Sequence, residues 1–246
     1  MSTDDLFAKE NLEKAIEELS SEYKKISSNE KISKIILVGG AAVLLNYNFR
    51  RTTGDIDASI YSSEEMLNAI KKVAEKNKYP NDWINTDFEN SPSYSEKLDE
   101  VSKYYKTFNN KIEVRLIEGE YLIAMKLTSG RDYKHDLSDI AGILMEHKNR
   151  GKEIKMKDID KAVKYLYGNW DKISKESKML INEIFEDGDY EKVFKEKKKN
   201  EEKTKGNTLR FGNANNFIEM LKEEKDNENI IKELINKRDK EKSINI

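Results

Sequence analysis

The chain of 246 residues carries 45 basic and 47 acidic side chains, so its formal net charge of -2 gives no overall basic footprint for nucleic acid. It contains no cysteine, which excludes disulfides and thiolate zinc sites. No apolar run approaches the ~20 residues that span a bilayer, and the acidic N-terminus has no signal-peptide core, so we expect a cytoplasmic protein with no membrane partner.

Helix and strand patterns alternate in the first part of the chain. Apolar residues recur at helical spacing between Leu6 and Ile26, whereas Lys34–Val38 is a short apolar run typical of a buried strand. A helix is predicted over Ala41–Phe49. Alternation of apolar and polar residues then predicts a strand over Ile56–Ile60.

The next segment contains a helix, a hairpin and two further helices. Ser62 and Glu65 form a capping-box pattern, which predicts a helix that ends near Glu75. The Asn109-Asn110 pair predicts a tight turn between two strands. The remaining expected elements are the strands Tyr104–Phe108 and Ile112–Ile117 and the helices Tyr121–Ser129 and Asp136–His147, which are separated at Gly130.

Only helical patterns occur after Gly151. They cover Asp158–Tyr167, Ser174–Phe185 and Phe217–Lys237, and the Lys/Glu-rich run Glu191–Lys205 predicts a solvated helix or a linker. We therefore predict an α/β (α+β) domain over residues 1–150, with a small mixed sheet flanked by helices, and an all-α part over residues 151–246. The two histidines, His135 and His147, lack a metal-binding spacing and are expected on the surface.

Two aspartates flank the first residue of the second predicted strand. At strand period Asp55 and Asp57 point to one side, while Ile56 and Ala58 point into the core. Neighbouring carboxylates repel each other unless a cation lies between them, and Mg²⁺ prefers one or two carboxylates with phosphate oxygens and water. The pair therefore indicates a site for Mg²⁺ or Mn²⁺ bound with a triphosphate, although Asp-x-Asp alone is also common on exposed strands.

A pair of glycines ends the preceding strand. Gly39 and Gly40 allow the backbone N–H groups at the start of the next helix, including that of Ala41, to approach a phosphate. The positive potential of a helix N-terminus favours the same ligand, and Arg50 and Arg51 could bind further phosphate charge. Alone, a Gly-Gly pair is more often an ordinary tight turn.

The glycine pair, the arginines and the acidic pair together fit one ligand, a nucleoside triphosphate (NTP) with its metal. Thr53 lies between the arginines and the acidic pair, and we assign it to the same ligand. No Gly-Lys-Ser/Thr follows the glycines, which excludes a Walker loop, and the Gly-x-Gly-x-x-Gly pattern of a Rossmann turn is absent.

The segment from Gly39 to Asp57 resembles the signature of the DNA polymerase beta-like nucleotidyltransferase superfamily. In that signature a Gly-Gly or Gly-Ser corner precedes Asp-x-Asp, and a later strand supplies a third acidic residue. Many members have a serine after the first glycine. Here Ala41 follows Gly40, so the backbone has to supply the contact that a serine hydroxyl makes elsewhere.

A second cluster of charged residues follows further along the chain. Lys126 is the only charge in the apolar stretch Tyr121–Leu127, and a lysine in such a position is rarely buried without an anionic partner. Its ammonium group either extends to solvent or faces the Asp-x-Asp metal site or the triphosphate. Asp136 and Asp139 lie three apart on one face of the next predicted helix. From the sequence pattern, Asp136 is either a catalytic residue or the N-cap of this helix.

This cluster resembles a bacterial toxin-like nucleotidyltransferase family, related to abortive-infection and toxin–antitoxin proteins. In that family a helix with Leu-x-x-x-Lys precedes an Arg-Asp-x-x-Asp segment. Leu122 and Lys126 match the first part, and Asp136 and Asp139 match the second, with His135 where arginine is usual. The resemblance implies that Asp136 belongs to the active site.

The middle of the chain extends this resemblance. The segments Asp82–Asn85 and Ile112–Val114 also look like the family, and the likeness covers about residues 30–150. Glu113 lies on a predicted strand and is a second candidate for the third carboxylate. Lys111 and Arg115 share its face, so an ordinary salt bridge explains Glu113 equally well.

These patterns predict an Mg²⁺-dependent nucleotidyltransferase that transfers a nucleoside monophosphate from an NTP to an acceptor hydroxyl. The resemblance implies the 3′ end of tRNA or another RNA as acceptor, a toxin role in a toxin–antitoxin or phage-defence system, and a cognate antitoxin as partner. The alternatives are a non-catalytic nucleotidyltransferase-fold protein that acts as an antitoxin or scaffold and, with less support, an antibiotic adenylyltransferase.

Overall fold

The computed structural model of the chain describes residues 6–27, 32–60, 63–129 and 136–211. The chain divides into two compact units, residues 1–197 and 198–246. The sheet and the sites described below belong to the first unit. None of the helices in the described ranges combines the length and the apolar character that crossing a bilayer requires.

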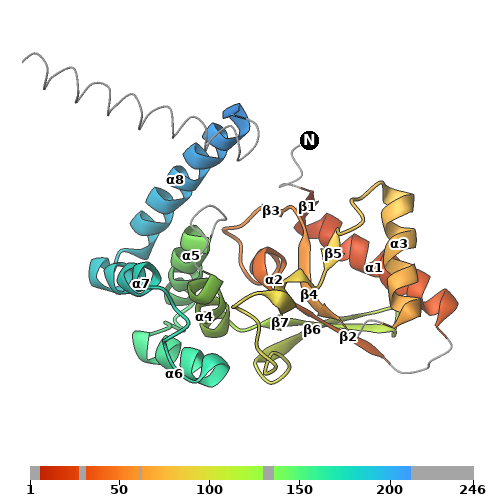
Figure 1. The fold of residues 1–246 in the computed structure, drawn as a ribbon, viewed down its shortest axis with the longest axis horizontal. Helices are drawn as coiled ribbons and strands as arrows, with labels where there is room; N and C mark the ends of the chain where they lie inside the picture. Colours follow the sequence, from red (N-terminus) through yellow and green to blue (C-terminus); the bar gives the residue numbers. More distant parts are fainter. Residues whose placement is uncertain (1–5, 28–31, 61–62, 130–135, 212–246) are drawn as a thin grey trace, which may run out of the picture. The chain divides into compact units, whose positions relative to one another are not determined.

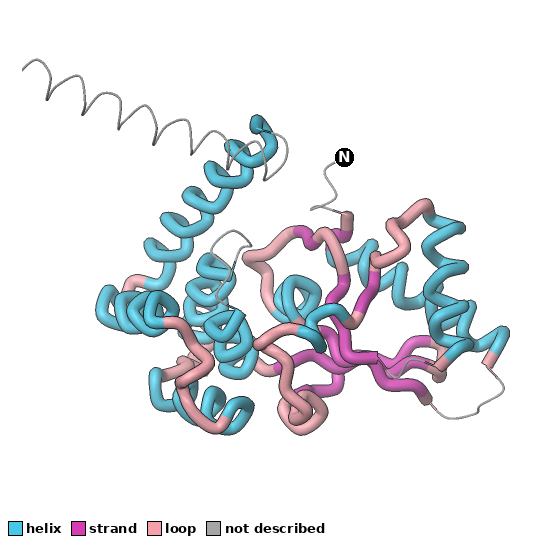
Figure 2. The backbone as a smooth tube through the Cα atoms, viewed as in Figure 1, coloured by secondary structure: helices cyan, strands magenta, loops and turns pink. Residues whose placement is uncertain are grey.

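A five-stranded mixed sheet forms the centre of the first unit (Figure 1), with the strand order β5-β4-β2-β7-β6. β4 pairs antiparallel with β2, and β2 pairs parallel with β7. Helices flank the sheet and a helical part follows it (Figure 2), which confirms the predicted α+β class. The strands are β2 (Ser33–Leu37), β4 (Ile56–Ile60), β5 (Ile84–Asn85), β6 (Ser102–Phe108) and β7 (Ile112–Ile117).

Two long helices, α1 (Lys9–Ile26) and α3 (Glu64–Asn77), pack against each other beside the sheet (Figure 1). The apolar stripe expected for α1 is buried, because its residues recur at three and four and face the core. The N-cap of α3 is Ser63, whose hydroxyl accepts a hydrogen bond from Met66 N at 3.2 Å. This corrects the prediction of a capping box at Ser62, which itself lies outside the described residues.

The predicted hairpin joins β6 and β7. Asn109 and Asn110 have φ angles of 49° and 54°, the left-handed values that favour asparagine in a tight hairpin turn. A second, two-stranded sheet was not predicted. It pairs β1 (Phe7–Ala8) antiparallel with β3 (Thr52–Thr53), which ties the start of the chain to the loop in front of the acidic strand.

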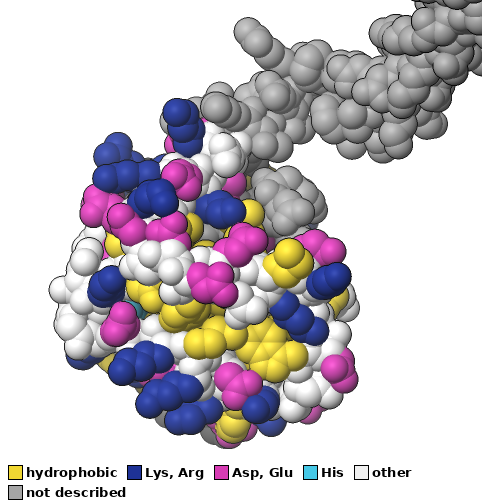
Figure 3. Space-filling view, turned by 90° about the vertical axis from the view of Figure 1, so that its left-hand side faces the viewer, with side chains coloured by type: hydrophobic (Ala, Val, Ile, Leu, Met, Phe, Trp, Pro, Cys, Tyr) yellow, Lys and Arg dark blue, Asp and Glu magenta, His cyan; other side chains and the backbone are white. Residues whose placement is uncertain are grey.

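Five helices follow the sheet: α4 (Gly119–Ser129), α5 (Asp136–Asn149), α6 (Met156–Tyr167), α7 (Lys175–Asp187) and α8 (Tyr190–Phe211). α4 packs against α5, α6 and α7, so the first helices of the C-terminal part belong to the same compact unit as the sheet. On the face shown in Figure 3, lysines and arginines are interspersed with acidic side chains. The helix predicted over Phe217–Lys237 lies outside the described residues.

Candidate functional site

The glycine pair forms a corner between β2 and α2 (Gly39–Asn46). Gly39 has a φ of +53°, a left-handed value that glycine adopts without strain. Val38 makes no side-chain cap, and Ala42 N donates to Val38 O at 3.1 Å. The backbone N–H groups of Gly39, Gly40 and Ala41 are therefore the ones that α2 leaves without an intrahelical acceptor, as an anion-binding helix start requires.

Asp57 lies directly beside this corner. Val38 N donates to Asp57 O at 3.0 Å, and a Cβ on Gly39 would lie only 2.7 Å from Asp57 Oδ2. Asp55 immediately precedes β4, in the bend that leads into the strand. Both aspartates are half-buried, whereas Ile56 is fully buried. The carboxylate of Asp57 and the start of α2 therefore meet at one point, and Asp55 lies two residues away in the sequence.

Thr53 and Arg50 lie against the second glycine. A Cβ on Gly40 would lie 2.5 Å from Thr53 Oγ1 and 2.7 Å from Arg50 Nη2. The Thr53 hydroxyl donates to Asp55 O at 3.2 Å, which ties the acidic turn to the same place. Arg51 is exposed on this loop. A hydroxyl and a guanidinium group thus join the amides and carboxylates at the corner.

A buried network of charges connects Arg50 with the second cluster. Lys126 Nζ lies 2.7 Å from Asp136 Oδ1 and 2.8 Å from Asp139 Oδ2, and Arg50 Nη1 lies 2.5 Å from Asp139 Oδ2. The Ser129 hydroxyl donates to Asp136 Oδ2 at 2.7 Å. Lys126 is buried, so its side chain does not extend to solvent, and the partners found for it are Asp136 and Asp139 rather than the acidic pair of β4. Among the described residues, these contacts join two positive and two negative groups.

The protonation of Lys126 follows from this balance. Burial alone lowers the pKa of its ammonium group, but the carboxylates of Asp136 and Asp139 outweigh burial and hold the pKa above its ordinary value. Lys126 therefore stays charged at neutral pH, and its charge is matched inside the protein.

Asp139 was not among the predicted site residues, yet it joins both cations of the network. It is 2% exposed, and its partner Arg50 lies 89 residues earlier in the sequence. Its spacing from Asp136 and its match to the Arg-Asp-x-x-Asp segment are the sequence signals that indicate it, because residues three apart share a helix face. Asp136 is the first residue of α5, and His135 lies outside the described residues.

Glu113 is separated from the acidic pair. Leu37 of β2 pairs with Ala58 of β4 on one side and with Leu116 of β7 on the other. Glu113 precedes Leu116 by three residues, which is about 10 Å along β7, and β7 lies two strand spacings, roughly 10 Å, from β4. Its carboxylate pairs with Arg115 Nη1 at 3.1 Å. The salt-bridge interpretation accounts for Glu113, and the structure does not bring it to the glycine corner.

The donors at the corner suit a magnesium ion shared with phosphate. Asp55 and Asp57 supply hard carboxylate oxygens, and Mg²⁺ in such sites takes one or two carboxylates and completes its shell with phosphate oxygens and water. Within the described ranges no group of three or more His, Cys, Asp or Glu side chains is placed to hold a metal.

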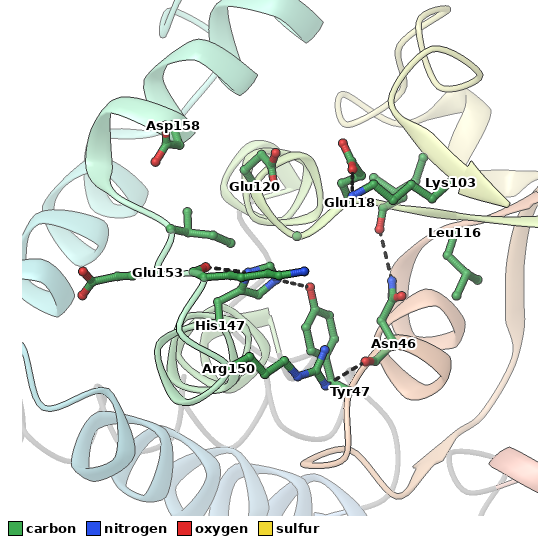
Figure 4. A pocket seen from close by; sticks show the side chains of 14 residues that line it. Asn46, Tyr47, Lys103, Leu116, Glu118, Glu120, His147, Arg150, Glu153 and Asp158 are labelled. Carbon is green, nitrogen blue, oxygen red and sulfur yellow. Dashed lines mark hydrogen bonds and ion pairs between the residues drawn. The ribbon is translucent and has the colours of Figure 1, made fainter. Parts of the chain in front are cut away.

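A cavity of about 680 Å³ lies elsewhere, at the other end of α2 (Figure 4). Tyr47 and His147 line it, with Nε2 of the imidazole 3.0 Å from the Tyr47 hydroxyl and Nδ1 3.1 Å from Lys152 O. Because a carbonyl only accepts, Nδ1 of the neutral ring carries the hydrogen and the Tyr47 hydroxyl donates to Nε2. His147 is half-buried and reaches the surface at this cavity-lining position. The site at the glycine corner is not part of this cavity.

We expect the stability of the protein to fall as the pH drops from about 8 to about 6, because of His147. Burial lowers the pKa of this imidazole below its ordinary value, so the folded state binds fewer protons than the unfolded state as the pH falls through about 6.5. Urea denaturation over this range measures the effect. His147→Gln should flatten the slope, and an unchanged slope in this variant contradicts the assignment.

Gly39→Ala is expected to weaken NTP binding roughly tenfold, because the new methyl group lies within 2.7 Å of the Asp57 carboxylate and must displace it. Gly151→Ala is the matched control. Its φ of +68° gives a similar strain of about 1–2 kcal/mol, but nothing lies within 4 Å of its Cβ position. Calorimetric titration with NTP and Mg²⁺ should separate the two variants, and equal affinities refute a role for the corner.

A glycine corner faces the acidic strand of a mixed sheet, and this arrangement agrees with the nucleotidyltransferase class that the sequence resembles. A family model described as "Nucleotidyltransferase of unknown function (DUF6036)" matches residues 14–178, and the chain belongs to this family. No curated protein and no solved structure gives a significant match. The match supports a nucleotidyltransferase with an NTP as substrate and leaves the acceptor to be inferred.

Proposed function

We propose that the protein transfers a nucleoside monophosphate from an NTP to an acceptor hydroxyl, with Mg²⁺ or Mn²⁺ held by Asp55 and Asp57. The observation that carries this proposal is the approach of the Asp57 carboxylate to Gly39, where a Cβ would lie at 2.7 Å. It brings metal-binding oxygens and free backbone N–H groups to one place, and a triphosphate with its metal needs both.

The residues at the corner then act as follows. The backbone N–H groups of Gly39, Gly40 and Ala41 donate to phosphate oxygens, with Arg50 Nη2 and the Thr53 hydroxyl beside them. These contacts hold the triphosphate so that the acceptor oxygen can approach the α-phosphorus in line. When bound, the metal neutralises charge on the phosphates. The acceptor oxygen bonds to the α-phosphorus, and pyrophosphate leaves with the electrons of the broken bond.

The second cluster completes the proposed site. Asp136 is our candidate for the group that accepts the proton of the acceptor hydroxyl, and Lys126 holds its carboxylate at 2.7 Å. Arg50 links this cluster to the glycine corner through Asp139. The positive group that this network presents to the proposed triphosphate is Arg50 Nη2, which lies beside Gly40.

The acceptor and the biological role rest on the sequence resemblance. The match of Leu122, Lys126, Asp136 and Asp139 to toxin-like nucleotidyltransferases supports the 3′ end of tRNA or another RNA as acceptor. The same resemblance supports a toxin role, with a cognate antitoxin as partner.

One observation favours a second candidate, a nucleotidyltransferase-fold protein that binds its ligand without catalysis, as an antitoxin or scaffold. The Lys126 ammonium group already has two carboxylate partners within 2.8 Å, so the network is complete without a phosphate. Calorimetry separates metal-dependent nucleotide binding from a bare scaffold that binds no nucleotide. NTP binding that requires Mg²⁺ and is lost in Asp55→Asn is expected for the enzyme and for a binding protein that keeps the site, and the labelling experiment below separates these two.

Labelled nucleotides test the reaction itself. The protein is incubated with total RNA, Mg²⁺ and each of the four NTPs, labelled in parallel at the α- or the γ-phosphate. Nucleotidyl transfer predicts that RNA acquires the α-label and never the γ-label, which leaves as pyrophosphate. Transfer of the γ-label would identify a kinase instead, and the absence of any transfer to RNA, protein or small acceptors with a hydroxyl counts against an enzyme.

A further inference from the structure

The Phe49 ring lies in a niche that a glycine provides. Gly142 stands inside α5, and a Cβ on it would lie 2.7 Å from both Cε2 and Cζ of Phe49. Glycine in a helix interior is less favourable than alanine by about 1 kcal/mol. Here the glycine allows the ring to contact the backbone of α5, which no other residue type at position 142 would permit without displacing the ring.

Two further aromatic rings enclose Phe49. Tyr47 stacks on it with ring centroids 5.7 Å apart, and Phe194 from the first turns of α8 meets it edge-on at 5.3 Å. Such pairs contribute about 0.5–1.5 kcal/mol beyond the burial of their area. The start of α8 thus packs on the loop between α2 and β3.

The backbone of the same loop is fastened to α5. Asn48 N and Phe49 N both donate to Glu146 Oε1, at 2.5 and 3.1 Å. Hydrogen bonds to an ionised carboxylate are stronger than neutral ones. Glu146 lies one helical turn after Gly142, so the ring and the backbone of Phe49 are held by the same face of α5.

The next residue is Arg50, whose side chain reaches the proposed triphosphate site. Its Nε donates to Thr52 O at 3.0 Å, its Nη1 pairs with Asp139 and its Nη2 lies beside Gly40. Consecutive Cα atoms are about 3.8 Å apart and the peptide between them is rigid. A displacement of Phe49 therefore moves the backbone from which the guanidinium group extends.

We propose that Phe49 is a positioning residue for the triphosphate: Gly142 and Phe194 hold its ring, and the ring sets the place of Arg50 beside Gly40. This inference rests on the proposed function and adds α8 to the elements that support the NTP site. The first turns of α8 then affect the affinity for the NTP without any contact between α8 and the NTP.

Two variants of the full chain test the proposal, with a non-hydrolysable NTP and Mg²⁺ titrated by calorimetry. Phe194→Ala and Gly142→Ala should each weaken NTP binding about tenfold, which corresponds to losing one well-placed charge-assisted hydrogen bond. Phe185→Ala is the matched control, since Phe185 makes a similar edge-on contact with Tyr190, at 6.0 Å, away from Phe49.

Each outcome bears on one claim. If the wild type does not bind the NTP, the proposed function fails and the inference fails with it. If the wild type binds and the Phe194 and Gly142 variants bind equally well, the function stands and the positioning role is wrong. A loss of affinity as large in Phe185→Ala shows general loosening of the helices and also refutes the positioning role. Melting temperatures of all variants show which losses go with a less stable fold.

Discussion

Asp57→Asn is expected to reduce nucleotidyl transfer by about a thousandfold and to leave the fold intact. The amide keeps the shape of the side chain, and the bond from Val38 N goes to the backbone carbonyl of residue 57, which the substitution does not touch. The lost negative charge removes one of the two carboxylates proposed for Mg²⁺, and groups that stabilise charge in a transition state are each worth about 10²–10³ in rate. Transfer of α-label from NTP to the acceptor, with circular dichroism as a check of folding, measures both parts.

Asp99→Asn provides the control for the change of charge. Its side chain is 58% exposed and pairs with Lys34 at 2.7 Å on the surface, away from the glycine corner. We expect this variant to transfer nucleotide at the wild-type rate. Full activity in Asp57→Asn would mean that the carboxylate beside Gly39 has no part in the reaction, and the proposed function would then lose its main support.

The acidic strand and the glycine corner could be predicted from the sequence because their signal is local. Alternating burial along Ile56–Ile60 and an apolar run before Gly39 reflect contacts that each strand makes with its immediate neighbours. The Asn109-Asn110 turn is local in the same sense. Such patterns need no knowledge of which strands pair.

The short strands could not be predicted in this way. β1, β3 and β5 contain two residues each, which is too short for any period to be visible. Strand order was equally out of reach, and it decides the case of Glu113. That residue lies on a strand as predicted, but the register of β2 with β7 places it far from Asp57.

The charged network shows the same limit at the candidate site. The sequence suggested that Lys126 needs an anionic partner, and Asp136 was already a candidate site residue. The contact between Arg50 and Asp139 joins residues 89 positions apart, and no spacing rule covers such a pair. Similarly, the sequence does not show why a glycine stands at position 142 of an apolar helix. The reason is the ring of Phe49, which lies against it in the structure. Long-range packing therefore supplies the part of the site that local patterns lack.

Lys126→Met is expected to lower the free energy of unfolding by about 3 kcal/mol, and the melting temperature by roughly 6–12 °C. Methionine fills a similar volume but leaves Asp136 and Asp139 buried, with Arg50 as the cation that the described residues still supply to them. An uncompensated buried charge costs far more than the loss of a surface pair. Urea and thermal denaturation of the wild type and the variant give the difference.

Two comparisons decide whether the loss of stability in Lys126→Met comes from the unpaired negative charge of the buried carboxylates. Lys34→Met breaks an ion pair whose partners are 44% and 58% exposed, so it should cost at most about 1 kcal/mol. Adding Asp136→Asn to Lys126→Met neutralises one of the stranded carboxylates and should recover part of the lost stability, since residues in one network are not additive. The contrary result is a double variant that is less stable than Lys126→Met, with the two substitutions lowering the free energy of unfolding additively. The destabilisation would then arise from lost packing, and the balance of charge around Arg50 and Lys126 would not stabilise the fold.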